Sequence, residues 1–361
     1  MHPTKAGKAA DPHNSQTPKR TSWQALRRAV LAAVAGSITL TAAACSTTTS
    51  DSGPAAAESA SRAIALRDFS ETALPTGIPV AFRLDDVLAH WCTACLTNVY
   101  NIFLEERVPL TVGVIGKDID SGAAYNQAGA RPAGTLMTLD AMSRFKSAGI
   151  PFEIASHSYS HPARGMPSLG GVDPQTEELA KAQTSIAKAL GATPMTFIPP
   201  TNRVDAATYS AMKRIGLRSV SGQCTWPHTN TEDDWTGDGT HDYCSGGSTT
   251  GNPTSIEMDR HIPNNVVEGI RTVPAGVVID AWSDFAQPVN QLSAYNWITT
   301  QYNAQGFAVI MLHPREMAAD HCEGNPSSTL DQEKVDAIRA IISKGRQLNW
   351  SFATLNGLPA S

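Results

Sequence analysis

The run Pro79-Val80-Ala81-Phe82-Arg83-Leu84 is mostly apolar and leads directly into two carboxylates, Asp85-Asp86. A short apolar run of this kind predicts a buried β-strand with the polar pair at its end. Adjacent carboxylates repel each other, so burying both is costly unless a cation lies nearby. A metal on one carboxylate and a proton-transfer role for the other would resolve that repulsion. The simpler alternative is a solvated turn at the end of the strand.

From this strand onward, short apolar runs alternate with patterns that predict helices. Predicted strands cover 79–84, 110–115, 151–155, 196–198, 273–279, 307–312 and 350–355. Predicted helices cover 96–106, 139–148, 175–190, 205–215 and 331–348. Strands that alternate with helices favour a parallel sheet in an α/β fold. About seven or eight such units favour a (β/α) barrel over an open sheet, and sites in such barrels lie at the carboxyl ends of the strands.

A second polar stretch, His157-Ser158-Tyr159-Ser160-His161-Pro162, follows the strand predicted at 151–155. If residues 158–161 make one helical turn, which Pro162 would end, both imidazoles lie on one face and can share a metal ion. Two His and one Asp leave coordination positions open, which is typical of a catalytic rather than a structural zinc site. The simpler alternative is a pair of surface histidines. The chain has only 10 His, so a close pair at a strand end favours the metal site.

Arg83-Leu84-Asp85-Asp86 followed by His157-x-x-x-His161-Pro162 resembles the first two motifs of the polysaccharide deacetylase (NodB-like) family. Further stretches resemble the third, fourth and fifth motifs and the last strand, in the family's order: Phe197-Ile198-Pro199-Pro200, Val278-Ile279-Asp280-Ala281-Trp282, Ile310-Met311-Leu312-His313-Pro314 and Trp350-Ser351-Phe352-Ala353-Thr354-Leu355. The resemblance covers about residues 78–357. It implies a distorted (β/α) barrel with about seven parallel strands, in a deacetylase domain over 77–361.

The resemblance also implies a role for each matching residue of the first two motifs. Asp85 corresponds to the general base, which takes a proton from the attacking water. Asp86, His157 and His161 correspond to the metal ligands. The metal is expected to be divalent, with Zn²⁺ favoured and Co²⁺ or Ni²⁺ as alternatives, and it would polarise the acetamide carbonyl and the bound water.

The later motifs imply the remaining roles. His313 corresponds to the general acid, which donates a proton to the leaving amine. Asp280 would hold His313 charged. Residues in or beside the third and fourth motifs are expected to contact the substrate: Pro199, Pro200, Asn202 and Trp282.

The sequence departs from the family pattern at two places. Val87 stands where the family usually has Gly after the Asp pair. The third motif lacks the Arg that usually pairs with the base, and Arg203 lies beyond the Pro-Pro. Arg83 is the better replacement, because residues two apart on a strand point to the same side and Arg83 lies two before Asp85. The alternative is a solvent-facing Arg83.

The N-terminal segment 1–44 has the anatomy of a secretory signal, with a basic flank that ends at Arg28 and an uncharged stretch over 29–44. Small residues directly before Cys45 resemble a bacterial lipoprotein processing site and favour lipidation of that Cys. The alternative is ordinary cleavage after an Ala, with Cys45 incidental. The Ser-, Thr- and Ala-rich stretch 45–76 predicts a flexible tether. The protein is therefore expected to be exported, either as a cell-envelope lipoprotein or in secreted form.

Export would permit disulfides. The cysteines after Cys45 are Cys92, Cys95, Cys224, Cys244 and Cys322, an odd number that leaves at least one unpaired within the chain. Cys224 and Cys244 flank a polar, Gly-rich stretch within a surface insertion predicted over 224–265, and they are the favoured pair. The other three leave open a bridge within Cys-x-x-Cys or a bond to Cys322.

The favoured function is removal of N-acetyl groups from an N-acetylated cell-envelope or extracellular polysaccharide. A different amide or ester hydrolase on the same site is one alternative, because a fold does not fix a substrate. A lipid-anchored carbohydrate-binding protein without catalysis is the other. A net charge of −5 gives no electrostatic footprint for nucleic acid, and only the possible lipid anchor would link the protein to a membrane.

Overall fold

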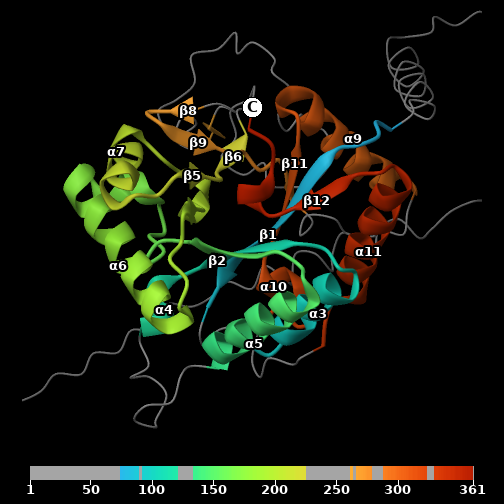
Figure 1. The fold of residues 1–361 in the computed structure, drawn as a ribbon, viewed down its shortest axis with the longest axis horizontal. Helices are drawn as coiled ribbons and strands as arrows, with labels where there is room; N and C mark the ends of the chain where they lie inside the picture. Colours follow the sequence, from blue (N-terminus) through green and yellow to red (C-terminus); the bar gives the residue numbers. More distant parts are fainter. Residues whose placement is uncertain are drawn as a thin grey trace, which may run out of the picture. The chain divides into compact units, whose positions relative to one another are not determined.

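Figure 1 shows the computed structural model of the chain, which describes residues 74–88, 92–120, 133–224, 261–262, 266–278, 288–322 and 329–360. All of them fall within Thr72–Ser361. The predicted signal segment, nearly all of the tether and Cys45 lie outside the described residues.

A mostly parallel sheet forms the centre of the described fold, which confirms the α/β class. Strand β1 (Pro79–Val87) pairs in parallel with β11 (Ala308–Leu312) and with β2 (Leu110–Val114). The parallel order continues from β2 through β3 (Phe152–Ser156), β4 (Thr196–Phe197), β5 (Ser219–Val220) and β9 (Ile270–Thr272). The other strands are β6 (Gln223–Cys224), β7 (His261–Ile262), β8 (Val266–Val267), β10 (Val277–Val278) and β12 (Ser351–Ala353).

One short segment, Ile270 to Val278, connects the two ends of this sheet. Its first part is β9, which pairs with β5, and its last part is β10, which pairs with β11. Between them, the Ala275 N–H donates to the Gly222 carbonyl at 2.7 Å, and the Gly276 N–H donates to the Val309 carbonyl at 3.4 Å. The segment thus leaves β5 and joins β11, an arrangement consistent with a distorted (β/α) barrel. The strand predicted over 273–279 was too long, because within its described part only Val277–Val278 form a strand, after the crossing.

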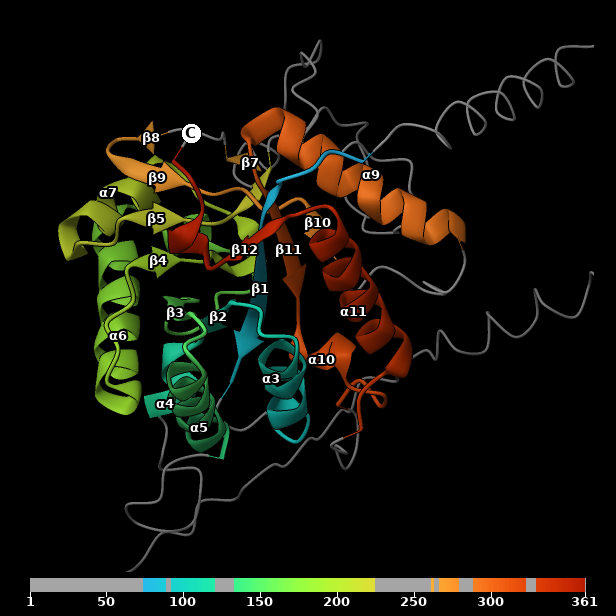
Figure 2. The same cartoon turned by 45° about the vertical axis from the view of Figure 1, so that its right-hand side comes forward.

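Helices surround the strands in both Figure 1 and Figure 2. They are α3 (Leu96–Glu105), α4 (Gly116–Asp120), α5 (Ala133–Ala148), α6 (Val172–Leu190), α7 (Ala206–Ile215), α9 (Pro288–Gln305), α10 (Pro314–Met317) and α11 (Gln332–Gln347). Local signals explain several ends: Asp205 caps α7 through a capping box, and Gly191 ends α6 in the left-handed conformation. None of the described helices has both the length and the apolar content needed to cross a bilayer.

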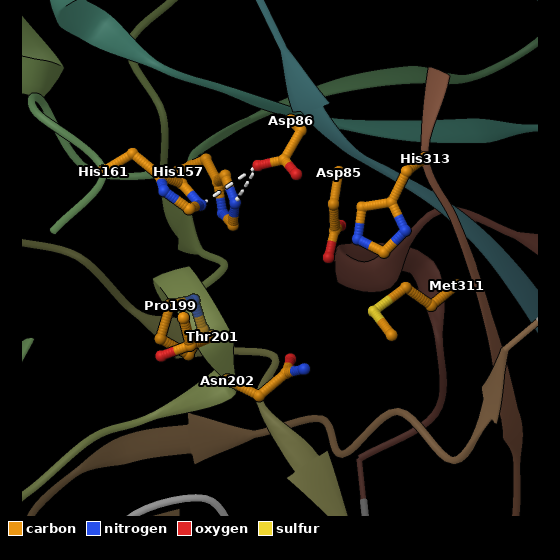
Figure 3. Close-up of a pocket in the computed structure, with 9 residues that line it drawn as sticks. All are labelled: Asp85, Asp86, His157, His161, Pro199, Thr201, Asn202, Met311 and His313. Carbon is orange, nitrogen blue, oxygen red and sulfur yellow. Dashed lines mark hydrogen bonds and ion pairs between the residues drawn. The ribbon is translucent and has the colours of Figure 1, made fainter. Parts of the chain in front are cut away.

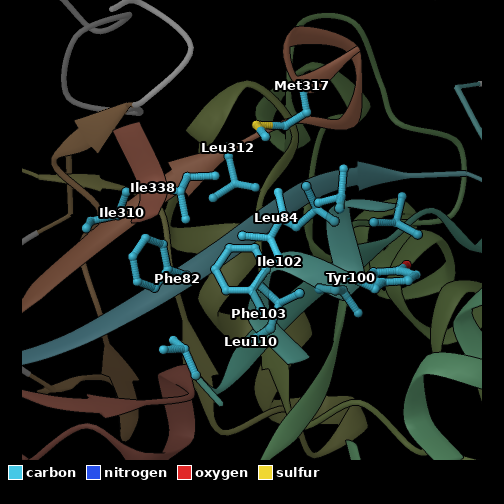
Figure 4. Close-up of a cluster of buried hydrophobic side chains, with 14 of the residues drawn as sticks. Phe82, Leu84, Tyr100, Ile102, Phe103, Leu110, Ile310, Leu312, Met317 and Ile338 are labelled. Atoms are coloured by element: carbon cyan, nitrogen blue, oxygen red, sulfur yellow. The ribbon is translucent and has the colours of Figure 1, made fainter. Parts of the chain in front are cut away.

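Successive side chains of β1 alternate between an apolar layer on one face of the sheet and the barrel interior on the other. Phe82 and Leu84 belong to the large core outside the sheet, where Phe82 meets Phe103 with ring centroids 5.2 Å apart (Figure 4). Ala81 belongs to a second apolar cluster, which also contains Ala155 of β3 and Val309 of β11. Successive strand residues point to opposite faces, so Arg83 follows Ala81 toward the interior. The outer core fixes the register of β1 and thereby delivers its polar residues to the inside of the barrel.

Candidate active site

The carboxyl ends of β1, β3, β4 and β11 converge on a cavity of about 200 Å³ (Figure 3). The cavity is lined by Asp85, Asp86, His157, His161, Pro199, Thr201, Asn202, Met311 and His313. Gly113 on β2 packs closely against two residues at these strand ends, because a Cβ there would lie 3.1 Å from the Ile198 side chain and 3.5 Å from His157 Cβ. The polar residues predicted from three separate motifs are therefore neighbours at one end of the barrel.

A β-bulge near the end of β1 brings both carboxylates to the cavity. The pairing of β1 with β2 shifts register between Leu84 and Val87, and Asp86 has a φ of 54°. In a regular strand Asp85 and Asp86 would point to opposite faces, but the bulge re-aims the second side chain. Asp tolerates the left-handed region better than most residues. Since the turn falls on Asp86, Val87 needs no glycine-like conformation.

Arg83 and Asp85 form a bidentate ion pair inside the barrel. Arg83 Nε donates to Asp85 Oδ1 at 2.8 Å and Nη2 donates to Oδ2 at 2.6 Å. The exposed fractions are 0% for Arg83 and 2% for Asp85, so both charges depend on protein partners. Nη1 also donates to Ser221 Oγ at 2.9 Å, and Nη2 to Asn202 Oδ1 at 2.9 Å. Arg83, placed two residues before the carboxylate, thus supplies the guanidinium missing from the third motif.

Asp86, His157 and His161 bring three ligand atoms together. Asp86 Oδ1 lies 2.9 Å from His157 Nε2 and 3.1 Å from His161 Nε2. His157 Nδ1 lies 2.7 Å from the Ile198 carbonyl oxygen, which can only accept, so the hydrogen bond places a proton on Nδ1. Nε2 of His157 donates to Asp86 when the ring is protonated on both nitrogens, and when the ring is neutral its Nε2 lone pair faces the carboxylate and is open to a metal ion that both would bind. Tetrahedral ligands about 2.1 Å from a Zn²⁺ ion are about 3.4 Å apart. The three residues therefore fit a metal ion.

The electrostatics of this group are dominated by its mutual contacts. Burial by itself raises the pKa of Asp86, but hydrogen bonds from His157 and His161 hold it well below its ordinary value. Burial lowers the pKa of His161, yet the hydrogen bond and charge of Asp86 raise it above its ordinary value overall. The carboxylate is thus ionised and available to a cation at neutral pH.

The helical turn predicted over 158–161 was wrong. These residues form a loop in which Ser158 has a φ of 65° and His161 a φ of 51°. The His161 N–H donates to Ser158 Oγ at 3.0 Å instead of making a helical backbone bond. The rings of His157 and His161 still approach to 4.9 Å between centroids. The physical reason is that neighbouring helices bind this loop's backbone, which overrides the local preference for a turn of helix.

His313 follows β11 directly and is the N-cap residue of α10, and its side chain lies at the cavity on the same side as Met311 (Figure 3). Its Nδ1 lies 3.9 Å from Glu316 Oε2, a carboxylate that the motif comparison had not singled out. Asp280, predicted to hold His313 charged, lies outside the described residues. The spacing of three residues within the first turn of a helix could have pointed to Glu316.

The predicted substrate contacts differ in where they lie. Pro199 and Asn202 line the cavity, although the Asn202 side-chain oxygen is bonded to Arg83. Pro200 is buried and is not among the lining residues, so its contact with substrate stays a prediction. It begins the short 3-10 turn Pro200–Asn202. Trp282 lies outside the described residues.

A disulfide joins Cys92 to Cys322, with Cα atoms 5.2 Å apart and a sequence separation of 230 positions. It links the region after β1 to the region after α10. Cys95 is a buried free cysteine beside it, and burial raises its pKa to about 11. Of the two arrangements left open, the bond to Cys322 is the one formed. The predicted pair of Cys224 and Cys244 lies outside what the structure describes, since the Cys224 side chain and all of Cys244 are not described.

The fold and the site define a distorted (β/α) barrel with an Asp-His-His set and a buried Arg-Asp pair at the carboxyl ends of its strands. Residues 75–220 match the family model described as polysaccharide deacetylase. The match covers less than half of the chain and includes the first three motifs, whose resemblance to this family it confirms. A comparison with curated proteins gives no match.

Solved structures with a similar fold include three from bacteria. A family 4 acetyl xylan esterase from Clostridium thermocellum is 17% identical, with a TM-score of 0.40 and coverage of 77% of this chain and 88% of that chain. A family 4 carbohydrate esterase from Streptomyces lividans is 15% identical, with a TM-score of 0.40 and coverage of 78% and 94%. A CE4 family pseudoenzyme from Bacillus anthracis is 14% identical, with a TM-score of 0.41 and coverage of 77% and 63%. The chain thus spans less than two thirds of the pseudoenzyme's length. Similarity at this level specifies no activity.

Proposed function

We propose that the protein is a metal-dependent hydrolase that removes N-acetyl groups from an N-acetylated polysaccharide of the cell envelope or extracellular matrix. The observation that carries the proposal is the geometry of one cavity. There, Asp86, His157 and His161 converge within ligand distance of one another, next to an Asp85 held by a buried guanidinium. Hydrolysis of an acyl group requires a base next to a metal ion that has open coordination positions, and this cavity offers the residues for both.

The residues divide the chemistry among them. A divalent ion held by Asp86, His157 and His161, with Zn²⁺ favoured and Co²⁺ or Ni²⁺ as alternatives, would polarise the acetamide carbonyl and acidify water. Asp85 takes the proton from the attacking water at its carboxylate. His313, across the cavity from the metal set in Figure 3, donates a proton to the nitrogen of the leaving amine.

The Arg83 guanidinium pairs with Asp85 through two hydrogen bonds and fixes the direction of its two oxygens. Ser221 and Asn202 in turn hold Arg83 in place. Asp85 is thereby oriented before substrate arrives, which is how an enzyme avoids the entropy cost of aligning a base during the reaction.

The size of the cavity supports a substrate of which only a small group enters. Pockets that enclose a drug-sized ligand measure about 300–1,000 Å³. At about 200 Å³, this cavity accommodates an acetamido group better than a whole sugar unit. A polymer would then lie across the mouth with one acetamido group inserted. An ester or a different amide of similar size fits the same cavity, so the test includes those substrates.

Acetate release from a panel of substrates tests the proposal. The panel contains chitin oligomers, peptidoglycan, poly-N-acetylglucosamine, acetylated xylan and a small acetate ester. We expect metal-loaded protein to release acetate from at least one N-acetylated glycan, and Asp85→Asn and His157→Ala to lose that activity. His157→Ala should also lose bound metal, whereas Asp85→Asn should retain it. Release from esters alone would favour the alternative hydrolase, and no release from any substrate by the metal-loaded protein would contradict the proposal.

A further inference from the structure

The loop between the two histidines is bound by a glutamate that no motif contains. Glu178 on α6 is 9% exposed, and its Oε1 accepts hydrogen bonds from the Tyr159 N–H at 3.0 Å, the Ser160 N–H at 2.5 Å and Ser160 Oγ at 2.8 Å. One carboxylate oxygen therefore collects three donors from two consecutive residues of this loop. Those residues lie directly before His161.

The other side of the loop is held by α4. The Gly116 N–H donates to the Ser158 carbonyl at 2.9 Å, and the Lys117 N–H donates to the Tyr159 carbonyl at 2.8 Å. Gly116 itself lies so close to α6 that a Cβ on it would be 2.7 Å from Ala182 Cα. Two helices in direct contact therefore bind the carbonyl groups and the N–H groups of the same short loop. This arrangement holds Ser158 and His161 in the left-handed conformation that a free chain would avoid.

The two histidines depend on this loop to different degrees. The His157 N–H donates to the Val114 carbonyl at 2.8 Å, and its ring bonds to the Ile198 carbonyl, so the sheet holds it directly. His161 follows the loop, its side chain is 31% exposed, and its backbone N–H donates to Ser158 Oγ. Loss of the Glu178 anchor should therefore displace His161 and leave His157 in place.

We infer that Glu178 is a positioning residue for the metal, which acts through the 158–161 loop to hold His161 at its ligand position. The inference rests on the proposed function, because it takes His161 as a ligand. Residues that orient metal ligands typically contribute a factor of about 10–100 to metal affinity. Glu178 would belong to that class although it lies 17 positions after His161 and on a different element.

The test measures Zn²⁺ affinity of the full chain by chelator competition, with the visible spectrum of the Co²⁺-loaded protein as a second measurement. We expect Glu178→Ala to weaken Zn²⁺ binding about 10–100-fold and to change the Co²⁺ spectrum. Glu178→Gln keeps an acceptor oxygen at the same reach, so it should bind Zn²⁺ within a few-fold of wild type. Glu178→Asp keeps the charge but shortens the side chain, so it should weaken binding as Ala does.

Two controls separate positioning from general destabilisation. Glu177→Ala removes a neighbouring charge whose side chain is 67% exposed and pairs with Lys181, so it should leave Zn²⁺ affinity unchanged. Glu178→Ala added to His161→Ala should cause no further loss of affinity, whereas added to His157→Ala it should. Circular dichroism and thermal unfolding establish that each variant is folded, and Glu178→Asp replaces Glu178→Ala if the latter is not.

The experiment distinguishes failure of the proposed metal site from failure of the proposed role of Glu178. A wild-type protein that binds no Zn²⁺ or Co²⁺ would overturn the proposed metal site and the role of Glu178 together. Tight Zn²⁺ binding by both Glu178→Ala and Glu178→Asp would overturn only the role of Glu178. An equal further loss of affinity in the His161→Ala and His157→Ala backgrounds would show that Glu178 stabilises the fold without acting through His161.

Discussion

Arg83 uses all three nitrogens of its guanidinium within the barrel. Nε and Nη2 bind Asp85, Nη1 binds Ser221, and Nη2 also reaches Asn202. Removing one partner of a buried ion pair leaves the other charge uncompensated, which typically costs about 3–5 kcal/mol. The Arg83 side chain thus affects two separate properties, the stability of the fold and the orientation of the base Asp85.

We expect Arg83→Ala to lower turnover about 100-fold or more, because Asp85 loses its fixed orientation. The acidic limb of the pH–rate profile should move to higher pH, since the ionised carboxylate is no longer favoured by a cation. Arg83→Lys keeps the charge but loses the two parallel hydrogen bonds. It should therefore bring the acidic limb of the pH–rate profile closer to its wild-type position than it brings turnover. Metal content should stay near wild type in both variants, because Arg83 is not a ligand. Full activity of Arg83→Ala with an unchanged profile would contradict this role.

Cys95 gives a prediction that depends on pH. Burial raises its pKa from 9.0 to about 11, so the thiol form is favoured in the folded protein. Iodoacetamide reacts with the thiolate, and at pH 8 we expect Cys95 to remain unmodified until the protein is unfolded in urea. Because the folded pKa is raised, the associated stability is complete below about pH 9 and is lost as the pH rises toward 11. Peptide mapping measures the labelling, and equal labelling with and without urea would contradict the burial of this thiol.

The sequence was sufficient to predict which residues come together in the candidate site, but not the backbone conformations of those residues. Asp85, His157 and His313 each follow an apolar run, and the carboxyl ends of parallel strands meet at one edge of a sheet. The left-handed conformation of Asp86 and the role of Ser221 depend on register and on contacts between distant segments. Local patterns do not contain those contacts, so neither feature could be predicted.

At the scale of elements, α11 and β12 meet at a glycine. A Cβ on Gly345 would lie 2.7 Å from the Trp350 ring and 2.8 Å from the Phe352 ring, closer than real Cβ contacts come. Trp350 is also fixed by its own hydrogen bond, from Nε1 to the Pro75 carbonyl at 3.0 Å. Because Gly345 has no side chain, the last helix packs directly against Trp350 and Phe352, and the hydrogen bond of Trp350 joins this region to the segment before β1.

Gly345→Ala should destabilise the protein by about 1–3 kcal/mol, the usual effect of overpacking a core. Helix propensity alone would favour Ala by about 0.5–1 kcal/mol, so the steric effect has to exceed that gain. Urea unfolding monitored by Trp fluorescence gives the free energy of unfolding. Ser343→Ala, on an exposed position of the same helix, is the matched control and should change it by less than about 0.5 kcal/mol. A Gly345→Ala protein as stable as wild type would show that the rings can move aside.

Elements with strong local signals were predicted to within a few residues. Helix 175–190 has a regular apolar period and ends at Gly191, and the structure gives α6 as Val172–Leu190. Helix α9 (Pro288–Gln305) was missed, since its sequence is rich in uncharged polar residues and lacks a clear apolar face. The strand predicted over 273–279 was too long, because the point at which this segment changes partner from β5 to β11 depends on contacts between distant strands.

At the scale of the whole molecule, export remains a proposal that rests on the N-terminal sequence. We expect removal of residues 1–44 and acylation of Cys45, because the basic flank, the apolar stretch and the small residues before Cys45 resemble a processing site. The intact mass of protein extracted from membranes of a bacterial host tests this directly. A mature chain that begins elsewhere with an unmodified Cys45 would contradict lipidation and leave secretion standing.

The disulfide also determines what happens when the chain is cut. Cys92 and Cys322 lie 230 positions apart, and the sequence between them includes the predicted surface insertion over 224–265. A single protease cut anywhere inside that interval leaves the two fragments joined, because the covalent path through the two sulfurs is intact. Asp85 and Asp86 lie just before this interval and His313 just inside its other end, so the cut protein would keep them in one molecule. A protein cut once in the insertion should therefore run as one species on a non-reducing gel and as two after reduction.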